Sequence, residues 1–239
     1  MANRVFITGD IHGPQDIRRL NRTFKVGETL DADDFLIICG DFGLVWDNRS
    51  KCNYWLRWLE RKPFITLFVD GNHENFDMLD AMEPECWHGG LVHRVNSSVL
   101  HLMRGQVFDI AGASFFCMGG ARSVDKARRI IHKSWWPQEI PSAEEREAAM
   151  ATLDAHGWRV DYVLTHCAAS AVQYLLNPTY ENDELTLFLG DVEQRLDYRH
   201  WYFGHYHEDR PITDRQTVVF EDVIELPCDA SANGAGETR

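Results

Sequence analysis

Five short polar blocks carry the residues best suited to chemistry in this 239-residue chain. They supply aspartate, asparagine and histidine, whose oxygen and nitrogen atoms bind divalent cations without thiolates. A pair of cations also needs one bridging carboxylate, and Asp41, alone in its block, is the natural candidate. These types predict a two-metal site. The blocks are residues 9–13 (Gly-Asp-Ile-His-Gly), 40–41 (Gly-Asp), 71–74 (Gly-Asn-His-Glu), 165–166 (Thr-His) and 204–207 (Gly-His-Tyr-His).

An apolar run that reads as a buried strand precedes each block. Ligands of open α/β sheets bind at the carboxyl ends of the strands, so the five blocks are expected to meet at one edge. Glycine stands before a ligand in four of the five blocks, where the missing Cβ lets the backbone turn sharply. The strands are predicted at residues 4–8, 34–39, 64–69, 162–164 and 201–203.

The order of the blocks closely resembles that of the calcineurin-like metallophosphoesterase family. The family motifs D-x-H, G-D, G-N-H-[DE], H and G-H-x-H are matched in order over about residues 5–210, and they use five of the eleven histidines. A lone Gly-Asp or Gly-His pair carries little weight, but an ordered set of five does. The resemblance implies that Asp41 bridges and that His73 faces the substrate as a proton donor or charge stabiliser. It further implies a first metal bound by Asp10, His12 and His207, and a second bound by Asn72, His166 and His205.

The resemblance also implies a fold, a cofactor and a reaction. The fold is a four-layer α/β/β/α sandwich with two mixed sheets and the metal site at the carboxyl ends of the central strands. The cofactor is two divalent ions, Mn²⁺ first, with Fe or Zn as alternatives. The reaction is hydrolysis of phosphomonoesters or phosphodiesters by a metal-bridging hydroxide.

Two other functions compete with this one. Some relatives are nucleases, but the formal charge of −13 disfavours general nucleic-acid binding. Others are non-catalytic scaffolds, which typically lose ligands that this chain retains. The expected partner is therefore a phosphate-ester substrate.

The second block departs from the protein-phosphatase pattern G-D-x-x-D-R-G. Residues 40–47 (Gly-Asp-Phe-Gly-Leu-Val-Trp-Asp) lack both the second aspartate and the arginine at those positions. Asp47 could approach His73 from further along the loop, although a surface turn aspartate is an equal alternative. The departure removes the strongest indication of the substrate.

A basic island offers a replacement for the missing arginine. Residues 121–133 form part of a loop-rich insertion, and Arg122, Arg128 or Arg129 could contact phosphate oxygens in it. Trp46, Trp135 and Trp136 could form an aromatic wall for a base or aryl group, although packing is the commoner role of tryptophan. The candidate substrate contacts are Arg122, Arg128, Arg129 and Trp46.

The remaining pattern predicts one α/β domain over residues 1–226 and a disordered tail over residues 227–239. Helices are expected from Pro14, over residues 54–61, from a capping box at Ser142 to about Ala155, and over residues 185–196. Strands at 99–102, 107–110 and 113–118 are expected to form hairpins, and residues 217–220 and 223–226 to form closing strands.

Composition places the chain in a reducing cytoplasm. The six cysteines show no C-x-x-C pair, and no apolar stretch approaches the ~18 residues of a membrane span. Six histidines stand outside the five blocks and are expected to pack or lie at the surface: His88, His93, His101, His132, His156 and His200.

Overall fold

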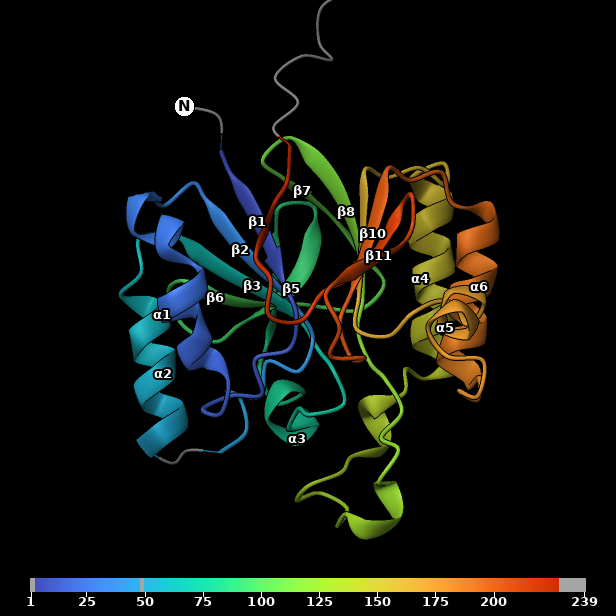
Figure 1. The fold of residues 1–239 in the computed structure, drawn as a ribbon, viewed down its shortest axis with the longest axis horizontal. Coiled ribbons are helices and arrows are strands. Elements are labelled where there is room, and N and C mark those ends of the chain that lie inside the picture. Colours follow the sequence, from blue (N-terminus) through green and yellow to red (C-terminus); the bar gives the residue numbers. More distant parts are fainter. Residues whose placement is uncertain (1–2, 48–49, 228–239) are drawn as a thin grey trace, which may run out of the picture.

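Two mixed β-sheets face each other, and helices cover the outer face of each sheet (Figure 1). The computed structural model describes residues 3–47 and 50–227. The predicted four-layer α/β/β/α sandwich is confirmed. Residues 228–239, which hold all but the first residue of the expected tail, lie outside the described part of the chain.

The first sheet has the order β13-β1-β2-β3-β6-β5-β4. Strands β1, β2, β3 and β6 run parallel, and the strands beyond them at both edges pair antiparallel. The strands are β1 (Val5–Thr8), β2 (Phe35–Cys39), β3 (Ile65–Val69), β4 (Pro84–Trp87), β5 (Gly90–Arg94), β6 (Val99–Leu102) and β13 (Ile224–Glu225).

The second sheet has the order β11-β12-β10-β9-β8-β7, again with a parallel centre and antiparallel edges. Its strands are β7 (Gln106–Ile110), β8 (Ala113–Met118), β9 (Tyr162–Thr165), β10 (His200–Phe203), β11 (Arg210–Thr213) and β12 (Gln216–Val218).

Helices α1 (Leu20–Thr23) and α2 (Ser50–Glu60) lie on the outer side of the first sheet, with α3 (Phe76–Leu79) below the strand ends in Figure 1. Helices α4 (Ala143–Ala155), α5 (Ser170–Leu176) and α6 (Glu184–Arg195) cover the second sheet. The predicted capping box of α4 is present, since the Glu145 amide donates to the Ser142 hydroxyl and the Ser142 amide donates to the Glu145 carboxylate. Short 3-10 turns occupy Ile17–Arg19, Lys25–Thr29, Lys126–Arg128 and Pro137–Glu139.

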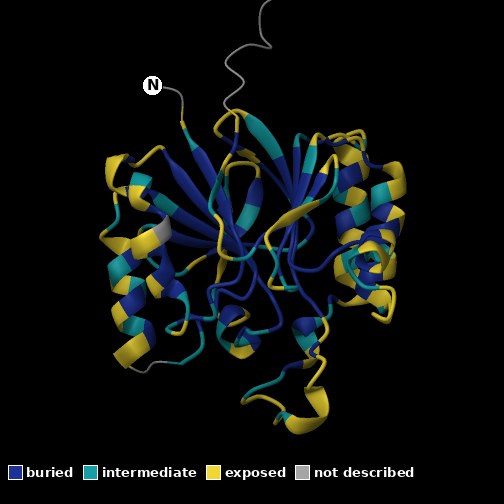
Figure 2. Ribbon diagram, viewed as in Figure 1, coloured by how far each residue is buried: buried dark blue, intermediate teal, exposed yellow. Residues whose placement is uncertain are grey.

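The central strands are mostly apolar, in keeping with the burial of both of their faces (Figure 2). In β1, Val5 and Ile7 face the core between the sheets, whereas Phe6 packs in the core on the helix side of the first sheet. A third core lies between the second sheet and its helices, around Trp201 and Leu189. This burial fixes the strand ends that carry the polar blocks.

Some expectations for the middle of the chain are wrong. Strands β7 and β8 form the predicted hairpin, but β6 and β7 belong to different sheets, so the turn at Arg104 and Gly105 is a crossover. The helix expected from Pro14 begins only at Ile17, as a 3-10 turn that runs directly into the short helix α1. Strands β4, β5 and β11 and helix α5 were not predicted. None of the helices in the described ranges is both long and apolar enough to cross a bilayer.

A buried ion pair joins the end of β3 to the crossover. Asp70 accepts from Arg104 Nη2 at 2.6 Å and Nε at 2.9 Å, and its other oxygen lies 3.1 Å from His101 Nε2. Burial alone would raise the pKa of Asp70, but Arg104 and His101 hold it well below its usual value. Arg104 also donates to the Gln138 carbonyl at 2.7 Å, so the pair ties the first sheet to the insertion. His93 and His101 pack here with ring nitrogens 3.1 Å apart, as expected for histidines outside the blocks.

Asp70→Asn is expected to lower the free energy of unfolding by about 3 kcal/mol, since it removes the nearer and more buried of the two carboxylates that face the Arg104 guanidinium, at 2.6 Å against 3.3 Å for Glu145. The folded-state pKa of Asp70 lies below the unfolded-state value, so the stabilisation is complete above about pH 4 and is lost as the pH falls toward the folded-state pKa. Urea unfolding of the metal-free protein between pH 7 and pH 3 measures both effects. A mutant as stable as the wild type at pH 7 would contradict the prediction.

Candidate metal centre

The five polar blocks meet at the carboxyl ends of β1, β2, β3, β9 and β10, at one end of the paired sheets (Figure 1). Asp10, Asp41 and His205 each come two residues after their strands, β1, β2 and β10, and His166 directly follows β9. Because β1, β2 and β3 are parallel neighbours and β9 and β10 are parallel neighbours, the strand ends bring these side chains together.

Asp10, His12 and His207 form one group of donors. The Nε2 atom of His207 lies 3.2 Å from Asp10 Oδ2, and the Nε2 atom of His12 lies 4.0 Å from the same oxygen. The three side chains offer donor atoms that all lie within 4.8 Å of one another, close enough to hold one ion. They are the three residues that the resemblance assigns to the first metal.

Asp41 lies between this group and a second one. Its Oδ2 is 3.4 Å from His12 Nε2, and its Oδ1 is 3.3 Å from His166 Nε2. His166 Nε2 also lies 3.3 Å from Asn72 Oδ1, and the ring of His205 packs 5.0 Å from that of His166. One carboxylate therefore faces both groups, as a bridging ligand must.

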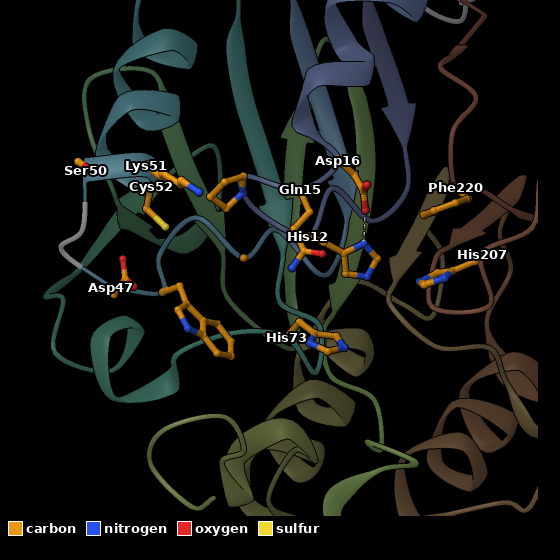
Figure 3. Close-up of a pocket in the computed structure, with 13 residues that line it drawn as sticks. His12, Gln15, Asp16, Asp47, Ser50, Lys51, Cys52, His73, His207 and Phe220 are labelled. Carbon is orange, nitrogen blue, oxygen red and sulfur yellow. Dashed lines mark hydrogen bonds and ion pairs between the residues drawn. The ribbon is translucent and has the colours of Figure 1, made fainter. Parts of the chain in front are cut away.

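Hydrogen bonds behind two of the imidazoles aim the opposite nitrogen into the centre. His12 Nδ1 lies 2.9 Å from Asp16 Oδ2 (Figure 3), and His166 Nδ1 lies 2.9 Å from the Cys39 carbonyl oxygen. Such partners fix the ring orientation and raise the basicity of a metal ligand. Carboxylate, amide oxygen and Nε2 form a donor set suited to Mn, Fe or Zn.

Four of the candidate ligands adopt left-handed backbone conformations. The φ angles are 43° at His12, 46° at Asp41, 68° at His205 and 52° at His207. Few non-glycine residues have positive φ, and such residues cluster at functional sites. The turn off the strand is thus made largely by the ligands themselves rather than by the glycines before them.

The preceding glycines mostly serve close approach. A Cβ on Gly204 would lie 2.2 Å from Asp10 Oδ1, and one on Gly71 would lie 2.1 Å from Asp41 Oδ1. Any side chain at these two positions would collide with a candidate ligand. The glycines in the blocks therefore permit the dense packing of donors.

Charge compensation in the centre acts between carboxylates and imidazoles. Burial alone would raise the pKa of Asp41, but His166 and His12 hold it well below its usual value. Burial alone would lower the pKa of His166, but Asp41 and Asp10 raise it to about 10. A cation that binds here must displace the proton of His166, so metal binding releases protons.

His73 lies at the open side of the centre with Arg129 beside it. The His73 amide donates to Asp41 Oδ1 at 2.7 Å, which holds the ring near the candidate metals. Arg129 Nη1 and Nη2 lie 3.3 Å from His73 Nδ1 and Nε2 respectively, so the guanidinium faces the ring. Burial, with Arg129 adding to it, holds the pKa of His73 below its usual value.

Arg129 is held in this place by its own insertion. Its Nε donates to Asp125 at 2.6 Å, and its Nη1 donates to the Ser134 carbonyl at 3.1 Å. The insertion thus brings a cation to the centre in place of the one missing after Asp41.

Two clefts open from the centre. The first has a volume of about 770 Å³ and is lined by His12, His73, Trp46 and Lys51, among others (Figure 3). The second has a volume of about 550 Å³ and is lined by Arg122, Tyr180 and Tyr206 together with His205. His207 lines both clefts, so they meet at the candidate metal centre.

The other predicted substrate contacts are placed differently from Arg129. Arg122 lies in the second cleft, 3.8 Å from Glu181, and Trp46 lies in the first with its ring packed edge-on against Trp136. Neither Arg128 nor Arg129 is among the described residues that line these two clefts; Arg128 is exposed, whereas Arg129 lies against the ring of His73. Asp47 lines the first cleft but stands apart from His73 in Figure 3.

Sequence reasoning missed residues that hold the ligand loops. Arg19 donates to the carbonyls of Gly9, at 2.9 Å, and Asp10, at 2.5 Å, and so fixes the first block from behind. Glu74 stands in the third block but had no predicted role. Its carboxylate accepts from the Phe42 amide at 2.7 Å, so it holds the loop after Asp41. Only Glu74 carried a signal, its place in a motif.

The sequence profile of the calcineurin-like phosphoesterases matches residues 3–209. No curated protein matches the chain. One similar solved structure is a Staphylococcus aureus protein, provisionally assigned as a 5′-nucleotidase, in complex with alpha-ketoglutarate. It shares 16% identity at a TM-score of 0.49 over 93% of this chain, which spans 50% of that structure's length.

The family match covers most of the chain and includes the five blocks. It supports hydrolysis of phosphoesters with bound metal, and the Asp and His clusters supply donors for that metal. The chain belongs to the calcineurin-like phosphoesterase family.

Proposed function

We propose that the chain is a dinuclear metal-dependent phosphoesterase that hydrolyses phosphomonoesters or phosphodiesters. The observation that carries the proposal is Asp41, whose two oxygens face His12 and His166 on opposite sides. Two bound divalent ions, Mn²⁺ being our first choice, supply Lewis acidity that lowers the pKa of a coordinated water and offsets phosphate charge. Asp10, His12 and His207 would hold one ion, Asn72, His166 and His205 the other, and Asp41 both.

The remaining side chains of the centre act on the ester itself. His73 faces the cleft and would donate a proton to the leaving oxygen or stabilise its charge. Arg129 would pair with a phosphate oxygen, since its Nη atoms lie 3.3 Å from the ring nitrogens of His73, beside the candidate ligands. His73 and Arg129 together would orient the ester over the ligands.

The two clefts favour substrates with a group on each side of phosphorus. Because the clefts meet at His207, one group could occupy the pocket of Trp46 and Lys51 while the other reaches Arg122 and Tyr180. A diester, or a monoester with a large alcohol group, would use this space better than a small monoester.

Metal content and a substrate panel test the proposal. The purified chain is expected to bind two Mn²⁺ ions and to hydrolyse nitrophenyl phosphate, bis-nitrophenyl phosphate, or both, with EDTA removing the activity. Cyclic nucleotides, dinucleoside polyphosphates and phosphopeptides extend the panel. Protein that binds no transition metal and fails on both aryl esters with Mn²⁺ present would overturn it.

Arg129→Ala is expected to lower kcat/KM by roughly 10-fold to 100-fold, the loss of a hydrogen bond from a charged donor to phosphate. Arg128→Ala is the matched control, because Arg128 is an exposed neighbour of the same charge, whereas Arg129 is the residue whose guanidinium lies 3.3 Å from the His73 ring nitrogens. Steady-state kinetics of both variants with Mn²⁺ measure the effect. Equal kcat/KM for Arg129→Ala and the wild type would remove Arg129 from the site.

A further inference from the structure

A buried chain of hydrogen bonds leads from the metal centre into the insertion. Asn72 Nδ2 donates to Ser123 Oγ at 3.2 Å, and Ser123 Oγ donates to Glu139 Oε2 at 2.6 Å. The Ser123 amide donates to the other Glu139 oxygen at 3.0 Å. All three residues are at most 5% exposed, so water does not compete for these bonds.

The chemistry of the three side chains decides which group donates and which accepts in this series of hydrogen bonds. An ionised carboxylate only accepts hydrogen bonds, so the single hydroxyl proton of Ser123 goes to Glu139. The Ser123 oxygen is then left to accept, and its donor is the amide nitrogen of Asn72. The amide oxygen of Asn72 must in consequence point the other way, where it lies 3.3 Å from His166 Nε2.

We propose that Ser123 and Glu139 are positioning residues that present the Asn72 oxygen to the second metal ion. The inference rests on the proposed function. Without these hydrogen bonds, the side-chain amide of Asn72 could rotate by half a turn and place its NH₂ group toward the ion. An amide nitrogen that carries two protons cannot bind a metal ion. A chain that ends in a carboxylate also polarises the amide and makes its oxygen a better ligand.

The same two residues close the neck of the insertion that carries Arg129. The Ala121 amide donates to the Glu139 carbonyl at 3.0 Å, beside the side-chain bonds of Ser123. The support of the second metal ion and the support of the phosphate contact therefore share Glu139. Loss of the Ser123 hydroxyl should therefore affect metal binding more than it affects the stability of the fold.

Ser123→Ala isolates this role, because it removes the hydroxyl and keeps the hydrogen bond from the backbone amide of residue 123 to the Glu139 carboxylate. Titration of the metal-free full chain with Mn²⁺ by calorimetry should show one of two sites weakened by about 10-fold to 100-fold, the usual effect of removing a partner behind a metal ligand. With two equivalents of Mn²⁺ added, one more than the tighter site takes up, electron paramagnetic resonance should show a smaller fraction of coupled Mn²⁺ pairs in Ser123→Ala than in the wild type. Ser97→Ala, at an exposed serine far along the chain, is the matched control.

A double-mutant cycle with Asn72→Ala separates positioning from general support of the fold. If Ser123 acts through Asn72, Ser123→Ala should cause no further loss of Mn²⁺ affinity in the Asn72→Ala background. Glu139→Gln gives a second measurement if Ser123→Ala lowers the melting temperature of the metal-free protein. It preserves size, but its NH₂ group donates where the carboxylate accepted, and we expect the same single-site loss.

Two outcomes would overturn this inference and leave the proposed function standing. One is wild-type affinity for both Mn²⁺ ions in Ser123→Ala. The other is an equal loss of Mn²⁺ affinity on Ser123→Ala in the wild-type and Asn72→Ala backgrounds. A wild-type chain that binds fewer than two Mn²⁺ ions would overturn the proposed function and this inference with it. The calorimetry distinguishes the two failures before any substrate is added.

Discussion

Asp41→Asn is expected to lower kcat by at least about 10³-fold, because the site loses the only charge that both ions would share. Asp41 Oδ2 and Oδ1 lie 3.4 Å and 3.3 Å from His12 and His166 respectively, and an amide offers one ligand oxygen where the carboxylate offers two. Asparagine tolerates the φ of 46° at this position, so the backbone should be retained. Turnover of nitrophenyl phosphate with Mn²⁺ measures the loss of kcat, and circular dichroism of the same sample measures whether the fold is retained.

Asp33→Asn is the matched control, since it makes the same chemical change at an exposed aspartate. It should retain wild-type kcat. Activity of Asp41→Asn within about 10-fold of the wild type would show that Asp41 is not the bridging ligand and would require another carboxylate, with Asp10 the nearest choice.

His73→Gln is expected to lower kcat/KM by roughly 10²-fold to 10³-fold on an alkyl phosphate and by less than about 10-fold on nitrophenyl phosphate. The difference arises because an alkoxide needs a proton as it leaves, whereas nitrophenolate leaves well without one. The His73 ring faces the first cleft, and burial together with Arg129 lowers its pKa. The imidazolium is then a stronger acid, but a smaller fraction of His73 carries the proton near neutral pH, so the loss on the alkyl phosphate should grow as the pH falls. Kinetics on the two esters with saturating Mn²⁺ test the prediction.

The leaving-group dependence is the decisive observation for His73. An equal loss on both esters would assign His73 to charge stabilisation instead of proton donation. His156→Gln serves as the control, because His156 is an exposed histidine at the end of α4, outside the five blocks. It should leave both rates unchanged.

The strands and polar blocks that form the candidate site could be predicted because each depends on a local sequence pattern. A run such as Phe35–Cys39 is buried on both faces, so its apolar composition locates the strand, and Asp41 follows at the strand's end. The motif order then groups the blocks, and the structure brings together the predicted donors Asp10, His12, Asp41, His166 and His207.

Contacts made across long separations could not be predicted in the same way. The basic island indicated three arginines, and only packing of the insertion decides that Arg129 and not Arg128 reaches His73. Ser123 and Glu139 are single polar residues sixteen positions apart, with no motif around them, and their pairing depends on how the neck closes. The prediction of a hairpin at Arg104 is wrong because a tight turn has the same local sequence whether or not its strands pair.

The left-handed backbone at His12, Asp41, His205 and His207 sets a conflict between folding and activity. Each of these residues holds a conformation that glycine adopts freely, so glycine at His12, His205 or His207 would relieve backbone strain in the metal-free chain while deleting a ligand. At Asp41 the same change would also remove the charge that faces His166. Selection for thermal stability alone, without demand for turnover, would therefore remove the three histidine side chains early. The positions where this protein is easiest to stabilise are those that it can least spare.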